Sequence, residues 1–280
     1  MSVQFEDAVD GGVQLKYSST PLSRIDLGEL RQIIHELNLL SDRLGCVVFE
    51  GENRSRSDLV IFAGNLERFS MLSAAREVSS RVFYFQDTSS WWYDGSDLLP
   101  HISGIRNFLN RHVANRHCLA FGQSSGGYAA LAMGGLIPHI DVLACSPQTF
   151  ADGRIKKRLY VAPSLATQHT PEHLYDIAEL YRSAERSGMA AAIFSASEFN
   201  NPYESHFWID HLHLSNIAPV PSIDIHIGDS ANHSIVFQKA ALFSRCLRAL
   251  LASIKKKPEV KRVIIRDLVR EMTKGGGRDE

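Results

Sequence analysis

The chain has 280 residues, a formal net charge of −1, 44% apolar residues and 22% charged residues. This profile is typical of a soluble globular protein with a substantial core; it excludes a disordered chain and gives no reason to expect a nucleic-acid partner. No apolar stretch has the roughly eighteen residues that a membrane span needs, and acids occupy the start of the chain where a signal peptide would be basic and then apolar. We therefore expect a cytoplasmic protein without membrane contact.

The four cysteines, Cys46, Cys118, Cys145 and Cys246, are widely separated along the chain. Their spacing fits neither a metal site nor a disulfide framework. We expect buried thiols, and neither a bound metal nor a cofactor.

Short runs rich in β-branched and aromatic residues alternate with longer helical patterns. This alternation predicts an α/β fold with a mainly parallel eight-stranded sheet and helices on both faces. The predicted strands are Val13–Tyr17, Cys46–Glu50, Leu59–Ala63, Val82–Phe85, Cys118–Phe121, Val142–Cys145, Ala191–Phe194 and Ile223–Ile227. The predicted helices are Asp26–Leu40, Phe69–Val78, Leu98–His112, Gly126–Leu136, Leu174–Arg186, Ser205–Leu214 and Ser234–Ile254.

The segment between the sixth and seventh predicted strands, residues 147–188, is too long for an ordinary connection. We expect it to be a cap inserted into one domain that spans residues 1–254. Thr170-Pro171 is a helix start within this cap. A basic cluster before that helix either attracts an acidic substrate or is a solvated loop: Arg154, Lys156, Lys157 and Arg158.

The last segment, residues 255–280, is predicted to be a tail with an amphipathic helix. Its acids offset its bases and no lipidation motif follows, which favours docking on its own domain or on a second subunit over membrane contact. A homo-oligomer formed through this helix is thus one expectation. The apolar residues that repeat at helical spacing are Val260, Val263, Ile264, Leu268 and Met272.

The most informative motif, Gly122-Gln123-Ser124-Ser125-Gly126-Gly127, lies between the fifth predicted strand and an Ala-rich helix. Where a strand is followed by Gly-x-Ser-x-Gly and then by a helix, the serine projects from a strained turn. The positions two residues before and two residues after the serine are crowded there. Glycine fits these positions because it has no Cβ. The spacing selects Ser124 over Ser125. The alternative interpretation is a glycine-rich turn without catalytic function, which binds either a phosphate or no ligand. The two common phosphate-binding patterns, G-x-G-x-x-G and G-x-x-x-x-G-K-S/T, are both absent.

On these residues the sequence resembles the α/β-hydrolase superfamily over roughly Leu59 to Leu251. The resemblance rests on four features: the turn Gly122 to Gly126, which is called the elbow below, the loop Gly64-Asn65, the position of His233 and the cap. One departure is that residues 18–45, with a predicted helix, separate the first two strands, where members of the superfamily have a tight hairpin. A narrower resemblance, to bacterial hydrolase-like proteins, covers Ser124 to Leu131 and Ser146-Pro147-Gln148. This narrower resemblance does not indicate a substrate.

In that superfamily the nucleophile follows the fifth strand, the acid follows the seventh and the histidine lies after the eighth. The resemblance implies Ser124 as the nucleophile. A polar turn after the eighth predicted strand ends in His233, which we expect to be the general base. The other histidines lie in predicted helices, in a strand, in the cap or before the seventh strand.

Three carboxylates are candidates for the acid that fixes the histidine tautomer and stabilises the imidazolium. Glu204 ranks first because it lies at a predicted helix start, Glu198 ranks second because it is nearer the strand end, and Asp210, further into the helix, ranks third. The alternative interpretation of Glu204 is a first-turn glutamate that the helix dipole favours.

The resemblance also implies an oxyanion hole made by two backbone N–H groups, those of Ser125 and Asn65. Asn65 follows the third predicted strand. In the loop after the fourth predicted strand, Trp91, Trp92 and Tyr93 either line an apolar or sugar-binding cleft beside the cap or pack beneath it.

Together these features predict a serine hydrolase that cleaves an acyl bond of a small-molecule or glycan substrate through a Ser-His-acid triad and an acyl-enzyme, without a cofactor. A carboxylic ester is the favoured bond. Thioesterase, peptidase and acyltransferase activity on the same triad remain alternatives, because the fold does not choose between them. A non-catalytic hydrolase-like binding protein is a further alternative. The last alternative is a nucleotide-binding protein. In that case we expect a phosphate to bind at the elbow and His233 to have no role.

Overall fold

The computed structural model describes residues 3–52, 55–64, 67–88, 92–114, 116–150, 174–197, 209–230 and 232–274. The strands are β1 (Glu6–Asp10), β2 (Val13–Ser18), β3 (Cys46–Phe49), β4 (Ser57–Phe62), β5 (Arg81–Phe85), β6 (His117–Gln123), β7 (Asp141–Cys145), β8 (Ala190–Ser195) and β9 (Asp224–Gly228). The α-helices are α1 (Leu27–Leu39), α2 (Ile102–Val113), α3 (Ser125–Leu136), α5 (Ile177–Ser183), α8 (Asp210–Ile217), α9 (Ile235–Gln238), α10 (Ala240–Ala252) and α11 (Pro258–Lys274). Two 3₁₀ helices are η1 (Leu22–Arg24) and η2 (Arg68–Ala75).

The described strands form one nine-stranded, mostly parallel sheet in the order β1-β2-β3-β5-β4-β6-β7-β8-β9. From β5 to β9 in this order, neighbouring strands run parallel, whereas β3 is antiparallel to β5. β2 is parallel to β3, and α1 makes the crossover that a parallel pair requires. The predicted fold class is therefore confirmed, and so is the helix expected between the first two predicted strands.

β1 is the one strand in the described residues that the sequence did not predict. It forms an antiparallel hairpin with β2 through Gly11 and Gly12, whose φ angles of 58° and 83° suit glycine. Its sequence is Glu-Asp-Ala-Val-Asp, and most of it is exposed. A polar edge strand of this kind lacks the apolar alternation by which buried strands are found.

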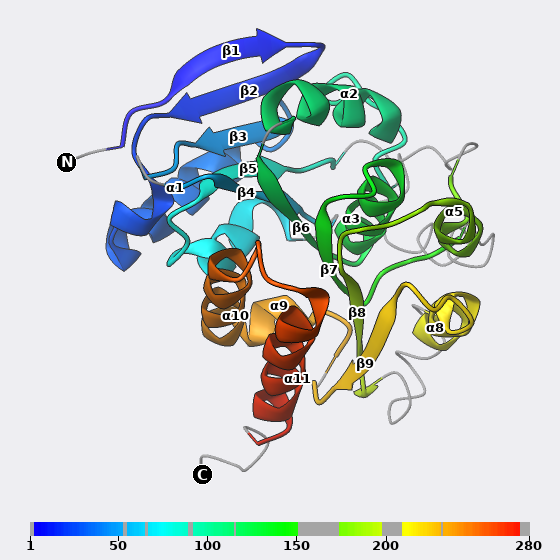
Figure 1. Cartoon of the computed structure of the whole chain (residues 1–280). Helices are drawn as coiled ribbons and strands as arrows, with labels where there is room; N and C mark the ends of the chain where they lie inside the picture. Colours follow the sequence, from blue (N-terminus) through cyan, green and yellow to red (C-terminus); the bar gives the residue numbers. More distant parts are fainter. Residues whose placement is uncertain are drawn as a thin grey trace.

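Helices cover both faces of the sheet (Figure 1). α2, α3, α5 and α8 pack on one face, while α1, η2, α9, α10 and α11 pack on the other. Side chains of the central strands alternate between these two cores: in β4, Val60 and Phe62 point to the first, and Leu59 and Ile61 to the second. Because both faces of the central strands are buried in apolar cores, the sequences of these strands are continuous apolar runs.

Several predicted helices have different bounds in the structure. The pattern at Phe69–Val78 forms the 3₁₀ helix η2, and the pattern at Ser234–Ile254 is divided into α9 and α10 at Lys239. The helix expected from Ser205 is described only from Asp210 onward, as α8. No helix in the described ranges is long and apolar enough to cross a membrane.

The predicted cap lies between β7 and β8. Residues 151–173, with Thr170-Pro171 and the basic cluster of Arg154, Lys156, Lys157 and Arg158, lie outside the described residues. The described remainder contains α5, which begins at an Asp176 cap whose side chain accepts a hydrogen bond from the Glu179 N–H. The cap therefore stays a prediction.

The tail helix α11 packs against α10 and β9 of its own chain (Figure 1). Ile265, Leu268 and Met272 are buried there, whereas Val260 and Val263, also expected on the apolar face, are 45% and 46% exposed. An oligomer formed through this helix stays a prediction.

Candidate active site

Ser124 lies at a sharp turn between the end of β6 and the start of α3. Its backbone angles, φ 57° and ψ −119°, belong to a region that L side chains rarely adopt. The Ser124 N–H donates a 2.8 Å hydrogen bond to the carbonyl oxygen of Cys145, at the end of the neighbouring strand β7. The strained turn is thus held by the sheet, and it projects the serine from the carboxyl edge of the strands.

The glycines of the motif lie where the sequence predicts crowding. A Cβ at Gly122 would overlap the carbonyl oxygen of Gly126. A Cβ at Gly126 would overlap the carbonyl oxygen of Phe62, at the end of β4. This crowding explains the Gly-x-Ser-x-Gly spacing around Ser124.

Three side chains from different parts of the sequence form a continuous hydrogen-bonded chain. Ser124 Oγ lies 2.8 Å from His233 Nε2, and His233 Nδ1 lies 2.8 Å from Asp210 Oδ2. His233 and Asp210 are only 3% and 1% exposed. Because a carboxylate only accepts hydrogen bonds, Nδ1 carries the proton, and Nε2 is left as the acceptor for the Ser124 hydroxyl. The geometry is that of a nucleophile, a base and an orienting acid.

The carboxylate at His233 is Asp210, which the sequence ranked third. Glu204 and Glu198, ranked first and second, lie outside the described residues. The ranking assumed that the helix begins near Ser205, whereas α8 begins at Asp210. Asp210 is therefore a first-turn residue, where the helix dipole favours a negative charge. It takes the place that the sequence ranking gave to Glu204.

Gln123, the residue before the nucleophile, holds the loop that carries the histidine. Its side chain is fully buried; Nε2 donates a 2.9 Å hydrogen bond to the carbonyl oxygen of His233, and Oε1 accepts one of 3.3 Å from the Val236 N–H. The sequence did not predict a role for Gln123. A long polar side chain in an otherwise small and apolar turn was the signal available.

Gln148 contacts Ser124 directly. Its side chain is 2% exposed, and its Nε2 lies 3.3 Å from Ser124 Oγ. Trp92 Nε1 donates a 2.9 Å hydrogen bond to Gln148 Oε1. Since an indole N–H can only donate, this bond fixes the amide oxygen toward Trp92 and the amide NH₂ toward Ser124. The resemblance of Ser146-Pro147-Gln148 to hydrolase-like proteins did not predict this function for Gln148.

Thr149, the residue after Gln148, joins this segment to α8, the helix that carries Asp210. The Thr149 N–H donates a 3.0 Å hydrogen bond to Nδ1 of His213, one turn after Asp210 on α8. The Thr149 hydroxyl also donates to the His213 carbonyl oxygen, at 3.1 Å. These buried contacts connect the segment beside the nucleophile to α8.

Of the two predicted oxyanion donors, Ser125 is described and Asn65 lies outside the described residues. Ser125 is the first residue of α3, at the positive end of the helix dipole. Gly64, just before Asn65, lies so close to the elbow that a Cβ there would be 2.9 Å from the Gln123 carbonyl oxygen. Gly64 therefore lies beside the end of the strand that leads into Ser124.

The aromatic residues after β5 are mainly interior. Trp91 lies outside the described residues. Tyr93 is buried; its hydroxyl lies 2.8 Å from the Ala63 carbonyl oxygen, and its ring packs edge-on against Phe62 at 5.4 Å. Trp92 is 4% exposed and reaches Ser124 through Gln148. The sequence left open whether these aromatic residues line a cleft or pack beneath it. Tyr93 packs beneath it.

The metal-ligating residue types and the four cysteines offer no second reactive centre in the part of the chain that the structure describes. Within the described ranges, no group of three or more His, Cys, Asp or Glu side chains is arranged to hold a metal ion. All four cysteines are free and buried, and burial raises the pKa of each thiol, that of Cys246 to about 12. At neutral pH these thiols are protonated and therefore poor nucleophiles.

No protein-family model matches the sequence, and no curated protein matches it. The chain is similar in structure to carboxylesterase CesB (YbfK) from Bacillus subtilis, with 11% identity and a TM-score of 0.52 over 80% of this chain and 97% of that one. Naproxen esterase (carboxylesterase NP) from Bacillus subtilis is 14% identical, with a TM-score of 0.51 over 78% and 95% of the two chains. MenH from S. aureus is 12% identical, with a TM-score of 0.51 over 76% and 99%. The protein has the α/β-hydrolase fold, as the resemblance in its sequence implied.

Proposed function

We propose that this protein is a serine hydrolase that cleaves a carboxylic ester through an acyl-enzyme. The observation that carries the proposal is the hydrogen-bonded chain from Ser124 through His233 to Asp210 at a strained elbow. Two of the structurally similar proteins are described as carboxylesterases, which supports an ester over other acyl bonds.

In the first half of the reaction, Ser124 Oγ attacks the ester carbonyl carbon while its proton passes to His233 Nε2. The carbonyl oxygen takes the electron pair of its π bond and becomes an oxyanion. The backbone N–H groups of Ser125 and Asn65 are the proposed donors to this oxyanion. Collapse of the intermediate breaks the bond to the alcohol oxygen, which leaves with the proton from His233.

In the second half, water repeats these steps on the acyl-enzyme. His233 takes a proton from water, and the hydroxide attacks the acyl carbon. The acid is then released, and Ser124 Oγ recovers its proton. Asp210 holds the imidazole tautomer throughout and stabilises the imidazolium without itself taking the proton.

Gln148 is proposed as a positioning residue for the nucleophile. Its amide NH₂ donates to one lone pair of Ser124 Oγ while the Ser124 hydroxyl donates to His233. Two contacts in different directions select one rotamer of the serine. The reacting oxygen is thereby held in place before substrate arrives.

Labelling with a fluorophosphonate probe tests the nucleophile. The wild type is expected to be labelled, and Ser124→Ala is expected to lose the label. Ser125→Ala is the matched control: it removes the neighbouring hydroxyl but keeps the backbone N–H, so labelling should persist. A folded wild type that never labels, or a labelled Ser124→Ala variant, would refute the proposal.

A panel of p-nitrophenyl esters, thioesters and aminoacyl amides tests the bond. We expect turnover of esters that disappears in Ser124→Ala. Ser124-dependent turnover of thioesters or amides alone would reject the ester assignment and keep the serine mechanism.

A further inference from the structure

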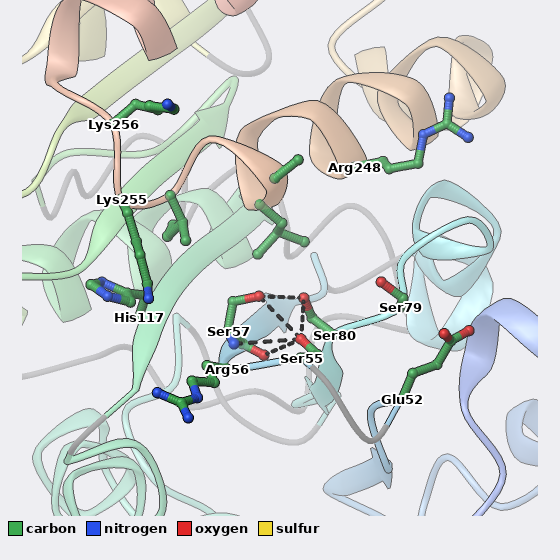
Figure 2. Close-up of a pocket in the computed structure, with 13 residues that line it drawn as sticks. Glu52, Ser55, Arg56, Ser57, Ser79, Ser80, His117, Arg248, Lys255 and Lys256 are labelled. Carbon is green, nitrogen blue, oxygen red and sulfur yellow. Dashed lines mark hydrogen bonds between the residues drawn. The ribbon is translucent and has the colours of Figure 1, made fainter.

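A cavity lies at the edge of the sheet opposite Ser124. It has a volume of about 640 Å³ (Figure 2). Ser57, the first residue of β4, lines it, as do Ser80, just before β5, and His117, the first residue of β6. Seven residues of β6 separate this edge from the elbow, a span of about 20 Å at the usual rise per residue. One small substrate cannot occupy both places.

Three serine hydroxyls converge inside the cavity (Figure 2). The Oγ atoms of Ser57 and Ser80 are 2.7 Å apart, and Ser55 Oγ lies 3.3 Å from each of them. Ser57 and Ser80 are only 8% and 3% exposed. Hydroxyls rotate to suit a partner, so this cluster can turn its O–H groups toward an oxygen-bearing ligand.

The support behind the hydroxyl cluster is positively charged. Arg116 Nη2 donates hydrogen bonds of 3.1 and 3.2 Å to the carbonyl oxygens of Ser55 and Ser57. Arg116 and Arg81 both bind the fully buried carboxylate of Asp58. Two guanidinium groups on one carboxylate leave a net positive charge directly behind the serines.

The rim adds further cations. Among the described residues that line the cavity, Arg56, Arg248, Lys255 and Lys256 are cationic and Glu52 is the one carboxylate. Arg248 also pairs with Glu77, at 2.9 Å. Figure 2 shows the Lys255 side chain extending toward His117 beside the serine cluster. The whole chain has a formal charge of −1, so this positive charge is local rather than compositional.

We infer that this cavity binds the phosphate group of a small phosphorylated ligand. A tetrahedral dianion accepts several hydrogen bonds at once, and here hydroxyl donors lie deep in a hollow surrounded by cations. Leu251, Ala252 and Ile254 supply an apolar wall for the uncharged part of the ligand. The hollow shape and the buried donors favour a small molecule over a membrane surface or a nucleic acid.

Isothermal titration of the full chain with inorganic phosphate and inorganic pyrophosphate, at low ionic strength, tests this inference. We expect saturable binding that Ser80→Ala and Lys255→Gln each weaken by at least about fivefold, the size of one lost hydrogen bond. Lys257→Gln is the matched control, because it removes the same charge from the same lysine run at a residue that does not line the cavity. Ser124→Ala should bind as the wild type does, which separates this site from the proposed ester hydrolysis.

Two results would overturn the inference. One is the absence of saturable binding for both anions. The other is equal weakening in Lys257→Gln and Lys255→Gln, which would indicate a diffuse effect of charge. Binding to anionic vesicles or RNA without binding of either small anion would likewise reject the small-molecule assignment.

Discussion

The carboxylate of Asp210 is buried at the first turn of α8 and accepts the hydrogen bond from His233 Nδ1. Asp210→Asn keeps the shape of this side chain but allows its amide to donate, which favours the wrong imidazole tautomer. We expect kcat/KM for the ester to fall by about 10⁴-fold, the loss seen when a triad aspartate becomes asparagine. Steady-state kinetics of Asp210→Asn on the best p-nitrophenyl ester provides the measurement.

Glu204→Gln and Glu198→Gln are the controls for this prediction. Each removes one charge, as Asp210→Asn does, and each should keep kcat/KM within about twofold of the wild type, because Asp210 is the acid in the proposed mechanism. Loss of activity at Glu204 combined with an active Asp210→Asn variant would restore the ranking made from the sequence.

A second prediction at this scale concerns Gln148 and Trp92. Gln148→Ala removes the donor to Ser124 Oγ, and we expect kcat to fall about fivefold with little change in KM, because one hydrogen bond contributes about 1 kcal/mol. Trp92→Phe keeps the aromatic bulk but removes the N–H that orients the amide, so a smaller fall is expected. Gln148→Glu should add a second pH dependence to that of His233, with activity falling as the pH rises, since only the protonated acid can donate to Ser124.

Circular dichroism and pH-rate profiles separate positioning from folding in these variants. Unchanged kcat in Gln148→Ala would contradict the positioning role. A pH profile of Gln148→Glu that matches the wild type would do the same.

At the scale of elements, α11 is joined to the sheet by a buried ion pair. Lys261 Nζ lies 2.6 Å from Asp141 Oδ2, with the two side chains 7% and 4% exposed. Asp141 also accepts the Met189 N–H, so its carboxylate is fixed at the start of β7. Lys261→Met leaves this charge buried without its cation, and we expect unfolding to become easier by about 3–5 kcal/mol.

Urea unfolding of Lys261→Met against the wild type measures this loss. Lys257→Met, at an exposed lysine just before α11, is the control and should change stability by less than about 0.5 kcal/mol. Equal stability of Lys261→Met and wild type would mean that α11 does not depend on this pair.

The elements that the sequence predicted well are those defined by local patterns. The apolar runs of the central strands and the glycine spacing around Ser124 are properties of short segments, so the fold class and the elbow turn could be found without a structure. β1 could not, because a polar edge strand gains its structure from pairing with β2. The start of α8 was also missed, and with it the rank of Asp210.

The contacts of Gln148 lay beyond the reach of sequence patterns for a different reason. Its partners Trp92 and Ser124 are 56 and 24 residues away along the chain. Side chains so far apart meet only because β5, β6 and β7 end at the same edge of the sheet. No spacing rule along one segment encodes such a meeting.

At the scale of the whole molecule, the core holds many groups that ionise readily in an unfolded chain. Burial raises the pKa of these thiols and phenols above their ordinary values of 9.0 and 10.0. They are Cys46, Cys118, Cys145, Cys246, Tyr84, Tyr93, Tyr128 and Tyr181. Above about pH 9 the unfolded state therefore binds fewer protons than the native state. Stability is fully present below that pH and is lost as the pH rises, by up to about 1.4 kcal/mol per pH unit for each such group.

Urea midpoints at pH 7, 9 and 10.5 measure this dependence. We expect a small change from pH 7 to 9 and a steep fall from 9 to 10.5. A midpoint that stays constant to pH 10.5 would mean that these groups reach solvent in the native state.

Gln123 links the strand before Ser124 to the loop that carries His233. It lies on β6 directly before the nucleophile, and its side chain holds the backbone of His233 from a separate loop. The serine and the imidazole are therefore brought together when the chain folds rather than when a substrate arrives. The entropy lost in joining these two groups is lost when the chain folds, so the proposed reaction begins with a high effective molarity of the imidazole beside the Ser124 hydroxyl.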